Sequence, residues 1–299
     1  MEPVEYTTLF AQEESFWWYR GLHRLVEQEM RRALPGLPRS VRMPGTRGLP
    51  GPLGSREPQR LKGECRSRGD AGSTAVGAAG DAAARPLRIL DAGSGTGGMT
   101  RRLAAWGDVT GLDWSPLALD LARRRGPLSW ARGSVERLPF RTGTFDLVVS
   151  LDVLYHRSVE SDLVALQEFR RCLRPGGSLV LNLPAYASLR SSHDAAIHTA
   201  RRYRRGPLTS LLRAAGLAPN RVTHWNAFLF PALVAVRWMR RRAGKAEGPA
   251  VSSDVRPVPG PINSVLGGIL ALERAWLARW DLPVGLSILA VARKPDGAD

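Results

Sequence analysis

Large apolar side chains recur at two different spacings along this chain, and the spacing predicts where helices and strands form. Within residues 7–34 the interval is roughly helical, as these positions show: Leu9, Phe10, Phe16, Trp17, Leu22, Leu25 and Val26. From Leu87 onward the apolar residues instead gather in short runs, of which 145–149 is typical. Runs of this length favour strands that are covered on both faces of a sheet.

Seven such strands are predicted after residue 86, with helical stretches between them. The predicted strands are Leu87–Asp91, Val109–Asp113, Ser129–Arg132, Phe145–Ser150, Ser178–Leu183, Arg221–Phe228 and Leu286–Arg293. Helices are predicted at about 98–106, 115–125, 160–173 and 207–215. Strands that alternate with helices indicate an α/β domain with a mainly parallel sheet and helices on both of its faces.

Two insertions interrupt this pattern. Residues 35–86 are dense in Gly, Pro, Arg, Ser and Ala, and their few apolar residues stand singly. Such a segment cannot bury enough surface to offset its ordering entropy, so we expect a disordered insertion. The second insertion, 229–281, lies between the last two strands and should contain an apolar helix over 229–242 and a helix over 263–280. The domain organisation expected is therefore an N-terminal helical region (1–34), the first insertion, and an α/β domain (87–299).

The charge and the cysteines of the chain bear on which partners and metal sites are possible. The formal net charge is +16, which by itself suggests nucleic acid or an anionic membrane. Nearly all of the basic residues are Arg, in a chain rich in Ala, Gly and Pro, which is typical of GC-rich coding. Nucleic acid is not favoured, because no strand interleaves basic and aromatic residues. Cys65 and Cys172 stand too far apart for a CxxC zinc motif.

The N-terminus is acidic and lacks an apolar signal core, and no apolar run approaches the ~18 residues needed to cross a bilayer. A cytoplasmic location is therefore expected.

A glycine-rich turn follows the first predicted strand. Asp91 ends that strand, and Gly93, Gly95 and Gly97 follow it before a helix begins. Glycines allow positive φ and let a ligand approach the main chain. With Gly98 this turn also satisfies the dinucleotide pattern GxGxxG, which leaves a nicotinamide-dependent oxidoreductase as an alternative. The acid before the turn favours a cationic ligand, since it would repel a pyrophosphate.

A second acid, Asp113, ends the second predicted strand. A carboxylate there can accept hydrogen bonds from both hydroxyls of a ribose, a role shared by nicotinamide and adenosyl ligands. The alternative is that Asp113 caps the following helix, but Ser115 before Pro116 is better placed for that role. Trp114, the neighbour of Asp113, joins the cofactor-binding set.

The order and spacing of several motifs resemble the class I S-adenosylmethionine-dependent methyltransferases, in particular the small-molecule subgroup with an LPF sequence after the third strand. The motifs are Asp91–Gly97, Asp113, Gly133–Phe140, Phe145–Val148 and Leu173–Gly177, within a region of about 87–184. The resemblance implies a Rossmann-like doubly wound sheet of seven strands, mostly parallel with the last strand antiparallel. It implies S-adenosyl-L-methionine as cofactor at the carboxyl ends of strands one, two and four.

Further roles are implied by this resemblance. In the family, the positions of Ser134 and Val135 border the adenine ring, and Leu151 lines the cofactor pocket. The family usually carries Asp where Ser134 stands. The segment Glu14–Arg20 resembles an N-terminal lid helix, although Trp17 and Trp18 could equally be core anchors.

Methyl transfer is an in-line displacement in which the enzyme mainly aligns the reacting atoms. For a hydroxyl acceptor a base helps to remove the proton, and the candidates are His156, His193 and His198. Asp194 could orient His198, from which it is four residues away on a helix. The alternative for each His is a surface or capping role. No metal site is expected, because His193 and His198 would diverge on a helix.

The acceptor is expected to be a small or lipid-like molecule. The helix at 229–242 is apolar and then basic, with Trp238 near its middle. It could cover the acceptor pocket, lie at a membrane surface as a peripheral contact, or pack in a dimer interface. A non-catalytic binding protein of the same fold is the rival hypothesis. The sequence does not define the acceptor, the atom that is methylated or the oligomeric state.

Overall fold

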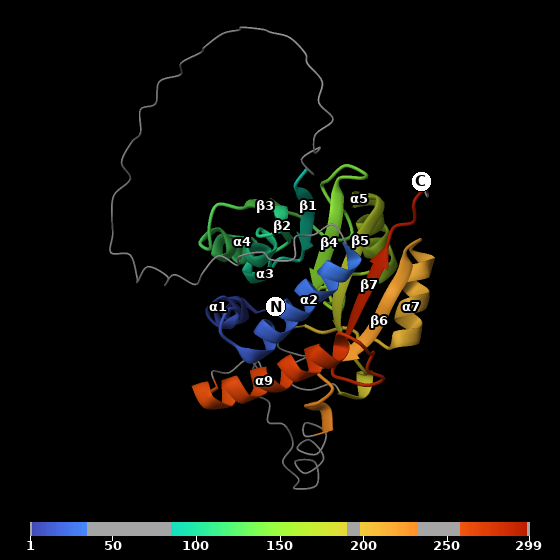
Figure 1. The fold of residues 1–299 in the computed structure, drawn as a ribbon. Coiled ribbons are helices and arrows are strands. Elements are labelled where there is room, and N and C mark those ends of the chain that lie inside the picture. Colours follow the sequence, from blue (N-terminus) through green and yellow to red (C-terminus); the bar gives the residue numbers. More distant parts are fainter. Residues whose placement is uncertain (1, 35–84, 190–197, 232–257, 298–299) are drawn as a thin grey trace, which may run out of the picture.

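The computed structural model describes residues 2–34, 85–189, 198–231 and 258–297, and within them one sheet runs through the molecule (Figure 1). The sheet has seven strands in the order β3-β2-β1-β4-β5-β7-β6. Their bounds are β1 Leu87–Ala92, β2 Gly107–Asp113, β3 Ser129–Arg132, β4 Phe145–Leu151, β5 Leu173–Pro184, β6 Ala218–Trp225 and β7 Ser287–Arg293. Strands β1 to β5 pair in parallel, whereas β7 is antiparallel to both β5 and β6. The predicted seven-stranded, mostly parallel sheet is confirmed.

Helices cover both faces of this sheet. The helices of eight residues or more are α1 Pro3–Gln12, α2 Trp17–Ala33, α4 Pro116–Arg123, α5 Asp162–Cys172, α7 Arg205–Ala214 and α9 Gly260–Leu277, and α3 Gly98–Leu103 is shorter. Two of them begin at a serine cap, since the Ser115 and Ser161 side chains accept from the N–H groups of Ala118 and Val164. The predicted role of Ser115 as the cap of α4 is confirmed.

The alternation of side chains along β4 divides the core into two layers. Val148 faces one layer, which contains Phe169 of α5 and Leu212 of α7. Leu147 and Val149 face the other layer, which is filled by α2, α3 and α9. Because successive side chains of a strand point to opposite faces, an unbroken apolar run needs cover on both sides. This explains why the three residues of β4 from Leu147 to Val149 are all apolar.

The N-terminal region predicted to be helical over 7–34 is helical but is divided into two helices, so the expectation of a single continuous helix is wrong. Helix α1 ends at Gln12 and α2 begins at Trp17. Asn263 of α9 stabilises the break, because its Oδ1 accepts from Trp17 N at 2.9 Å and its Nδ2 donates to Ser15 O at 3.0 Å. Periodicity alone did not reveal the break, since apolar residues continue across it.

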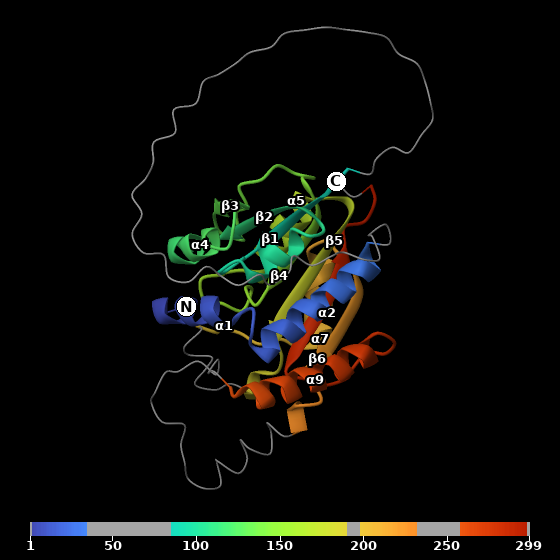
Figure 2. The ribbon, with the colours of Figure 1, turned by 60° about the vertical axis from the view of Figure 1, so that its left-hand side comes forward.

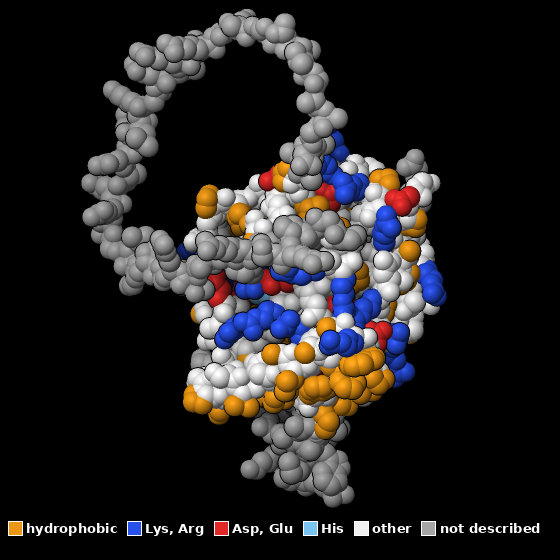
Figure 3. All heavy atoms as spheres, in the orientation of Figure 1, with side chains coloured by type: hydrophobic (Ala, Val, Ile, Leu, Met, Phe, Trp, Pro, Cys, Tyr) orange, Lys and Arg blue, Asp and Glu red, His pale blue; other side chains and the backbone are white. Residues whose placement is uncertain are grey.

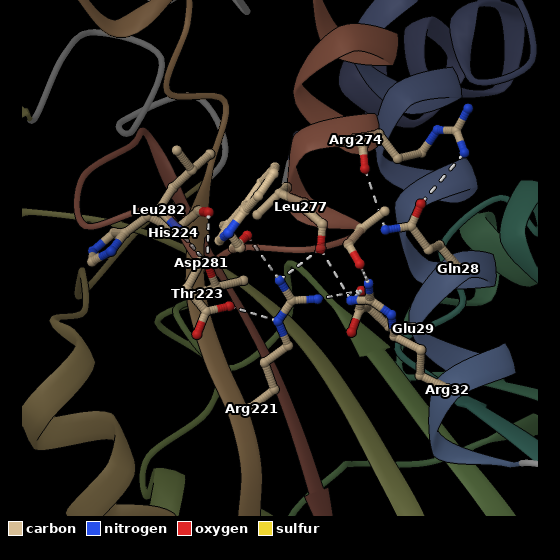
Figure 4. A network of polar contacts seen from close by, with 12 residues as sticks. Gln28, Glu29, Arg32, Arg221, Thr223, His224, Arg274, Leu277, Asp281 and Leu282 are labelled. Carbon is tan, nitrogen blue, oxygen red and sulfur yellow. Dashed lines mark hydrogen bonds and ion pairs between the residues drawn. The ribbon is translucent and has the colours of Figure 1, made fainter.

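Helices α2 and α9 lie side by side on one face of the sheet (Figure 2). A polar network joins them to β6, and Arg221 stands at its centre (Figure 4). The Arg221 guanidinium contacts Glu29 of α2 and Asp281 after α9, each at 2.7 Å, and donates to Leu277 O. The network fixes α9 against α2 and β6.

Several predicted segments lie outside the described residues: 35–84 of the first insertion, 232–257 of the second, and 190–197 with His193 and Asp194. The end of the first insertion is described. Arg85 binds the Asp146 carboxylate through two guanidinium nitrogens, at 3.0 and 2.6 Å, just before β1 begins.

Candidate active site

The glycine turn after β1 has the backbone that its sequence requires. Gly93, Gly95 and Gly97 have φ values of +86°, +52° and +82°, and Gly93 N donates to Leu112 O of β2 at 2.7 Å. A Cβ at Gly93 would lie 2.1 Å from a Val153 methyl group, so that position excludes any side chain. At Gly95 the nearest atom to a Cβ would be a Leu9 methyl group at 3.5 Å. Gly93 therefore serves packing, whereas Gly95 faces helix α1.

The acid at the end of β2 is held by the glycine turn. Asp113 Oδ2 accepts from Gly95 N and Oδ1 accepts from Ser115 N, both at 2.9 Å. Burial raises the pKa of this carboxyl, and the backbone N–H groups oppose the rise. A third backbone N–H, that of Trp114, also bonds to the carboxylate and lowers its pKa, so part of its acceptor capacity remains for ligand hydroxyls.

The acid at the end of β1 lies behind the turn. Asp91 is 2% exposed, and its Oδ2 accepts from Thr100 Oγ1 of α3 at 2.6 Å. Burial raises its pKa to about 7, although the Thr100 hydrogen bond opposes the rise. The nearby Glu13 and Asp113 carboxylates raise it further.

A third acid, which the sequence interpretation missed, follows β4. Asp152 has a positive φ of +59°, and its carboxylate accepts from Asn182 Nδ2 at 3.0 and 3.1 Å. Burial raises its pKa to about 7. The signal was present, since an acid directly follows a parallel strand whose carboxyl end lies beside that of β1. The predicted pocket residue Leu151 precedes it and packs toward the α2 layer.

Helix α1 lies along this edge of the sheet and contacts several parts of the predicted site. Near its start, Glu2 Oε1 lies 2.9 Å from His198 Nε2. Tyr6 is buried next to Asp113. Burial is the main cause that raises the pKa of its phenol, and the negative charge of Asp113 raises it further. Leu9 covers Gly95, as described above. The segment that covers the glycine turn is thus α1, whereas the lid was expected at Glu14–Arg20.

Glu13 anchors α1 to the turn. Its Oε2 accepts from Thr96 Oγ1 at 2.7 Å and from Gly98 N at 3.0 Å, and the Arg125 guanidinium lies 3.2 Å away. Burial raises the pKa of Glu13, and the charge of Arg125 opposes this. His23 lies 4.0 Å from the second Glu13 oxygen, and burial lowers its pKa to about 3. Sequence reasoning missed Glu13 because its partners are more than eighty residues away.

Tyr19 of α2 lies between two of these acids. Burial raises the pKa of its phenol first, and the charges of Glu13 and Asp152 raise it further. The hydroxyl therefore stays protonated and keeps a hydrogen to donate.

The remaining predicted cofactor residues lie around Asp113. Trp114 is 59% exposed, and its carbonyl accepts from Arg132 Nε of β3. Asp113 O accepts from Gly133 N at 3.1 Å, which brings the exposed Ser134 and the buried Val135 to the same edge. The structure thus groups Asp91, Gly93, Gly95, Asp113 and their neighbours at the carboxyl ends of β1, β2 and β3.

Two of the three predicted histidines meet. His156 and His198 stack with ring centroids 5.6 Å apart and planes inclined by 11°, and His156 Nδ1 lies 2.7 Å from Ser158 Oγ. Burial lowers the pKa of His156 to about 4, and the charge of a protonated His198 would lower it further. The third candidate, His193, lies outside the described residues.

A further polar group, which was not predicted, lies at the end of β6. His224 and Asn226 are 3% and 4% exposed, and His224 stacks on Tyr186 at 5.3 Å with planes 3° apart. The Leu282 carbonyl is close to the ring, but within the described chain neither ring nitrogen has a partner in hydrogen-bond geometry. Asn226 Oδ1 likewise lacks one there. Burial lowers the pKa of His224, so its ring is neutral at pH 7.

A doubly wound sheet with an antiparallel β7, and a glycine turn between acids that end β1 and β2, define the class I S-adenosylmethionine-dependent methyltransferase fold. Residues 90–181 match the family model of the methyltransferase domain.

Several methyltransferases are similar to part of this chain. Demethylmenaquinone methyltransferase of Beutenbergia cavernae is 41% identical over 101 residues, which cover 33% of this chain and 41% of that protein. Malonyl-(acyl-carrier protein) O-methyltransferase of Erwinia pyrifoliae is 39% identical over 113 residues, which cover 36% and 42%. The chain thus spans about two fifths of the length of these relatives. A solved structure of Haemonchus contortus phosphoethanolamine N-methyltransferase 2 with S-adenosyl-L-methionine has a TM-score of 0.47 and 18% identity, covering 71% of this chain and 49% of that chain.

Proposed function

We propose that this protein binds S-adenosyl-L-methionine and transfers its methyl group to a small-molecule or lipid-like acceptor. The observation that carries the proposal is the set of buried carboxyl groups around the glycine turn. Asp91, Asp113 and Asp152 all have raised pKa values because burial disfavours their charge, and no cation is paired with them among the described residues. A ligand with positive charges would relieve that cost.

The residues fit this cofactor. The Asp113 carboxylate would accept from the ribose hydroxyls, and Gly95 has no side chain between the main chain and Leu9 of α1. Trp114, Ser134 and Val135 would border the adenine, and Leu151 would line the pocket. The charge of Asp91 would favour the cationic amino acid part. S-adenosylmethionine, when bound, supplies an electrophilic methyl group on a sulfonium.

The protein would contribute alignment, exclusion of water and a proton acceptor. Helix α1 covers the turn through Leu9 and Glu13, which supports a role in keeping solvent from the bound cofactor. His156 is neutral at pH 7 because burial lowers its pKa, so it could accept a proton from an acceptor hydroxyl. His198 and His193 remain alternative bases.

The acceptor would reach the site from the side of β5 and β6. Among the described residues the His224 ring nitrogens and Asn226 Oδ1 are buried without good partners, and such groups cost about 1–3 kcal/mol each unless a ligand or water satisfies them. The relatives are named for a menaquinone precursor and a malonyl thioester, which supports a small or lipid-like acceptor.

Calorimetric titration of the full chain with S-adenosylmethionine tests cofactor binding. Conversion of the cofactor to S-adenosylhomocysteine, measured with a reduced naphthoquinone and with a malonyl thioester, then tests transfer. Lack of binding would refute the proposal. Binding without conversion on any acceptor tried, including metabolite extracts, would favour the non-catalytic binding protein.

A further inference from the structure

The outer face of α9 is an exposed apolar stripe. Five large hydrophobic side chains lie on it at helical spacing, each at least 46% exposed: Ile262, Val265, Leu272, Trp276 and Trp280, the last just after the helix end. The Trp276 and Trp280 rings contact each other, with centroids 4.9 Å apart. Monomeric proteins rarely expose a contiguous patch of this kind without a partner for it.

The opposite face of α9 explains why the stripe is not needed for folding. Leu270 and Leu277 are buried against α2, and Glu273 is 1% exposed, with its carboxylate accepting from the N–H groups of Ala227 and Phe228. The core side of the helix is therefore complete. Glu273 is also the only acid within α9, so the exposed stripe carries no negative charge.

A band of arginines runs beside the stripe, on α2 and α9. Arg20 and Arg24 are exposed, and Arg274 lies next to Gln28. Burial is the main cause that lowers the pKa of Arg24, and the positive charges of Arg20, Arg274 and Arg102 lower it further. Figure 3 shows hydrophobic side chains along the lower edge of the described surface, over α9, and Lys and Arg side chains just above them.

We propose that this face of α9, with the arginines beside it, binds the surface of an anionic lipid bilayer. An apolar stripe with two tryptophans, flanked by arginines, is the pattern of a helix that lies in the headgroup region. The stripe runs from residue 262 to residue 280, about 27 Å along a helix axis, so it would lie flat on the surface. Among the described residues no helix is long and apolar enough to cross a membrane. Charge complementarity selects lipid over an apolar protein partner, because the arginine band would repel a second copy of itself.

The stripe is joined through the fold to the elements around the proposed active site, but lipid binding does not depend on methyl transfer. Asn263 of α9 binds the break between α1 and α2, and Glu273 holds the chain after β6, so the stripe is rigidly connected to both the cofactor cover and the acceptor side. The inference concerns binding alone, and its test does not require methyl transfer.

The test is co-sedimentation of the full chain with vesicles of phosphatidylcholine alone and of phosphatidylcholine with 30% phosphatidylglycerol. We expect binding to the anionic vesicles, at least tenfold weaker binding to the neutral ones, and weakening with added salt. The variant Leu272→Ser/Trp276→Ser/Trp280→Ser should lose at least tenfold in binding. If it does not fold, Ile262→Ser/Val265→Ser tests the other end of the stripe. Arg24→Glu/Arg274→Glu should reduce binding to anionic vesicles alone.

Two matched controls lie elsewhere on the surface. Val164→Ser removes an exposed apolar residue of α5 (41% exposed), and Arg123→Glu reverses an exposed arginine of α4. Both should bind like the wild type. The proposal is overturned if the wild type stays in the supernatant with both vesicles, or if the stripe variants bind unchanged. Equal binding to neutral and anionic vesicles would overturn the choice of an anionic surface. A dimer that the stripe variants disrupt, without vesicle binding, would assign the face to a second copy.

Discussion

Glu13 and Arg125 form an ion pair inside the protein, 3.2 Å apart, with side chains 8% and 3% exposed. The pair connects the break after α1 to the turn after α4. Arg125 also donates to Thr96 O at 2.7 Å and to Phe10 O at 2.9 Å, so one guanidinium holds both the glycine turn and its cover. The attachment of α1 therefore depends on a few buried polar groups.

Glu13→Ala should lower the free energy of unfolding by about 1–3 kcal/mol, because it leaves the buried Thr96 hydroxyl and Gly98 N–H without their acceptor, while Arg125 keeps its ion pair with Glu14 at 2.8 Å. Urea denaturation measures the change. Asp120→Ala is the matched control, since it breaks an exposed pair with Arg123 and should have no measurable effect. A loss below 1 kcal/mol in Glu13→Ala would mean that α1 is not docked in solution.

Asp113→Ala should weaken binding of S-adenosylmethionine at least tenfold. The reason is the loss of two charge-assisted hydrogen bonds to the ribose, each worth roughly 1.5–3 kcal/mol. Calorimetric titration measures the affinity, with Asp108→Ala, an exposed acid at the other end of β2, as control. Unchanged affinity in a folded Asp113→Ala protein would remove Asp113 from the cofactor site.

Cofactor binding should strengthen as the pH rises from 6 to 8. Asp91 and Asp152 have pKa values near 7 in the folded protein, raised from 3.8. Between about pH 4 and 7 the folded state holds protons that the unfolded chain has released, so these acids make stability fall as pH rises and then level off above 7. A cationic ligand favours the ionised carboxylates, so its binding releases protons within this range.

Titration at pH 6.5 in two buffers of different ionisation enthalpy measures that release. Asp91→Asn should reduce it and Asp91→Asn/Asp152→Asn should abolish it. Proton release that persists in the double variant would assign it to other groups.

The sequence predicted those features that depend on neighbouring residues, and it did not predict those that depend on residues far away along the chain. The strands and the glycine turn depend on local pattern, as Leu147 to Val149 and the positive φ of Gly93 illustrate, and both were predicted. Glu13 could not be predicted as a site residue, because its role depends on Thr96, Gly98 and Arg125. The break between α1 and α2 was missed for the same reason, since Asn263 of α9 stabilises it.

His156→Ala should lower turnover of a hydroxyl acceptor by about 10²–10⁴ while cofactor affinity stays within twofold, because it removes a proton acceptor. With a pKa of about 4, His156 is already deprotonated at neutral pH, so wild-type kcat at saturating cofactor should not fall until the pH approaches 4. His198→Ala, which removes the stacked ring, should have a smaller effect. Full activity in His156→Ala together with loss in His193→Ala would transfer the role to His193.

His224→Phe should raise the free energy of unfolding by about 1 kcal/mol, because it removes two buried nitrogens without good partners and keeps a ring against Tyr186. If His224 contacts the acceptor, the same variant should raise KM for the acceptor at least tenfold while cofactor affinity is unchanged. Denaturant unfolding and steady-state kinetics measure the two effects separately. Asn226→Gly is the companion variant, since glycine accepts the positive φ of 56° at that position and the change removes the whole side chain, including its Oδ1. A less stable His224→Phe protein would show that the ring finds partners in solution, and an unchanged KM would place the acceptor elsewhere.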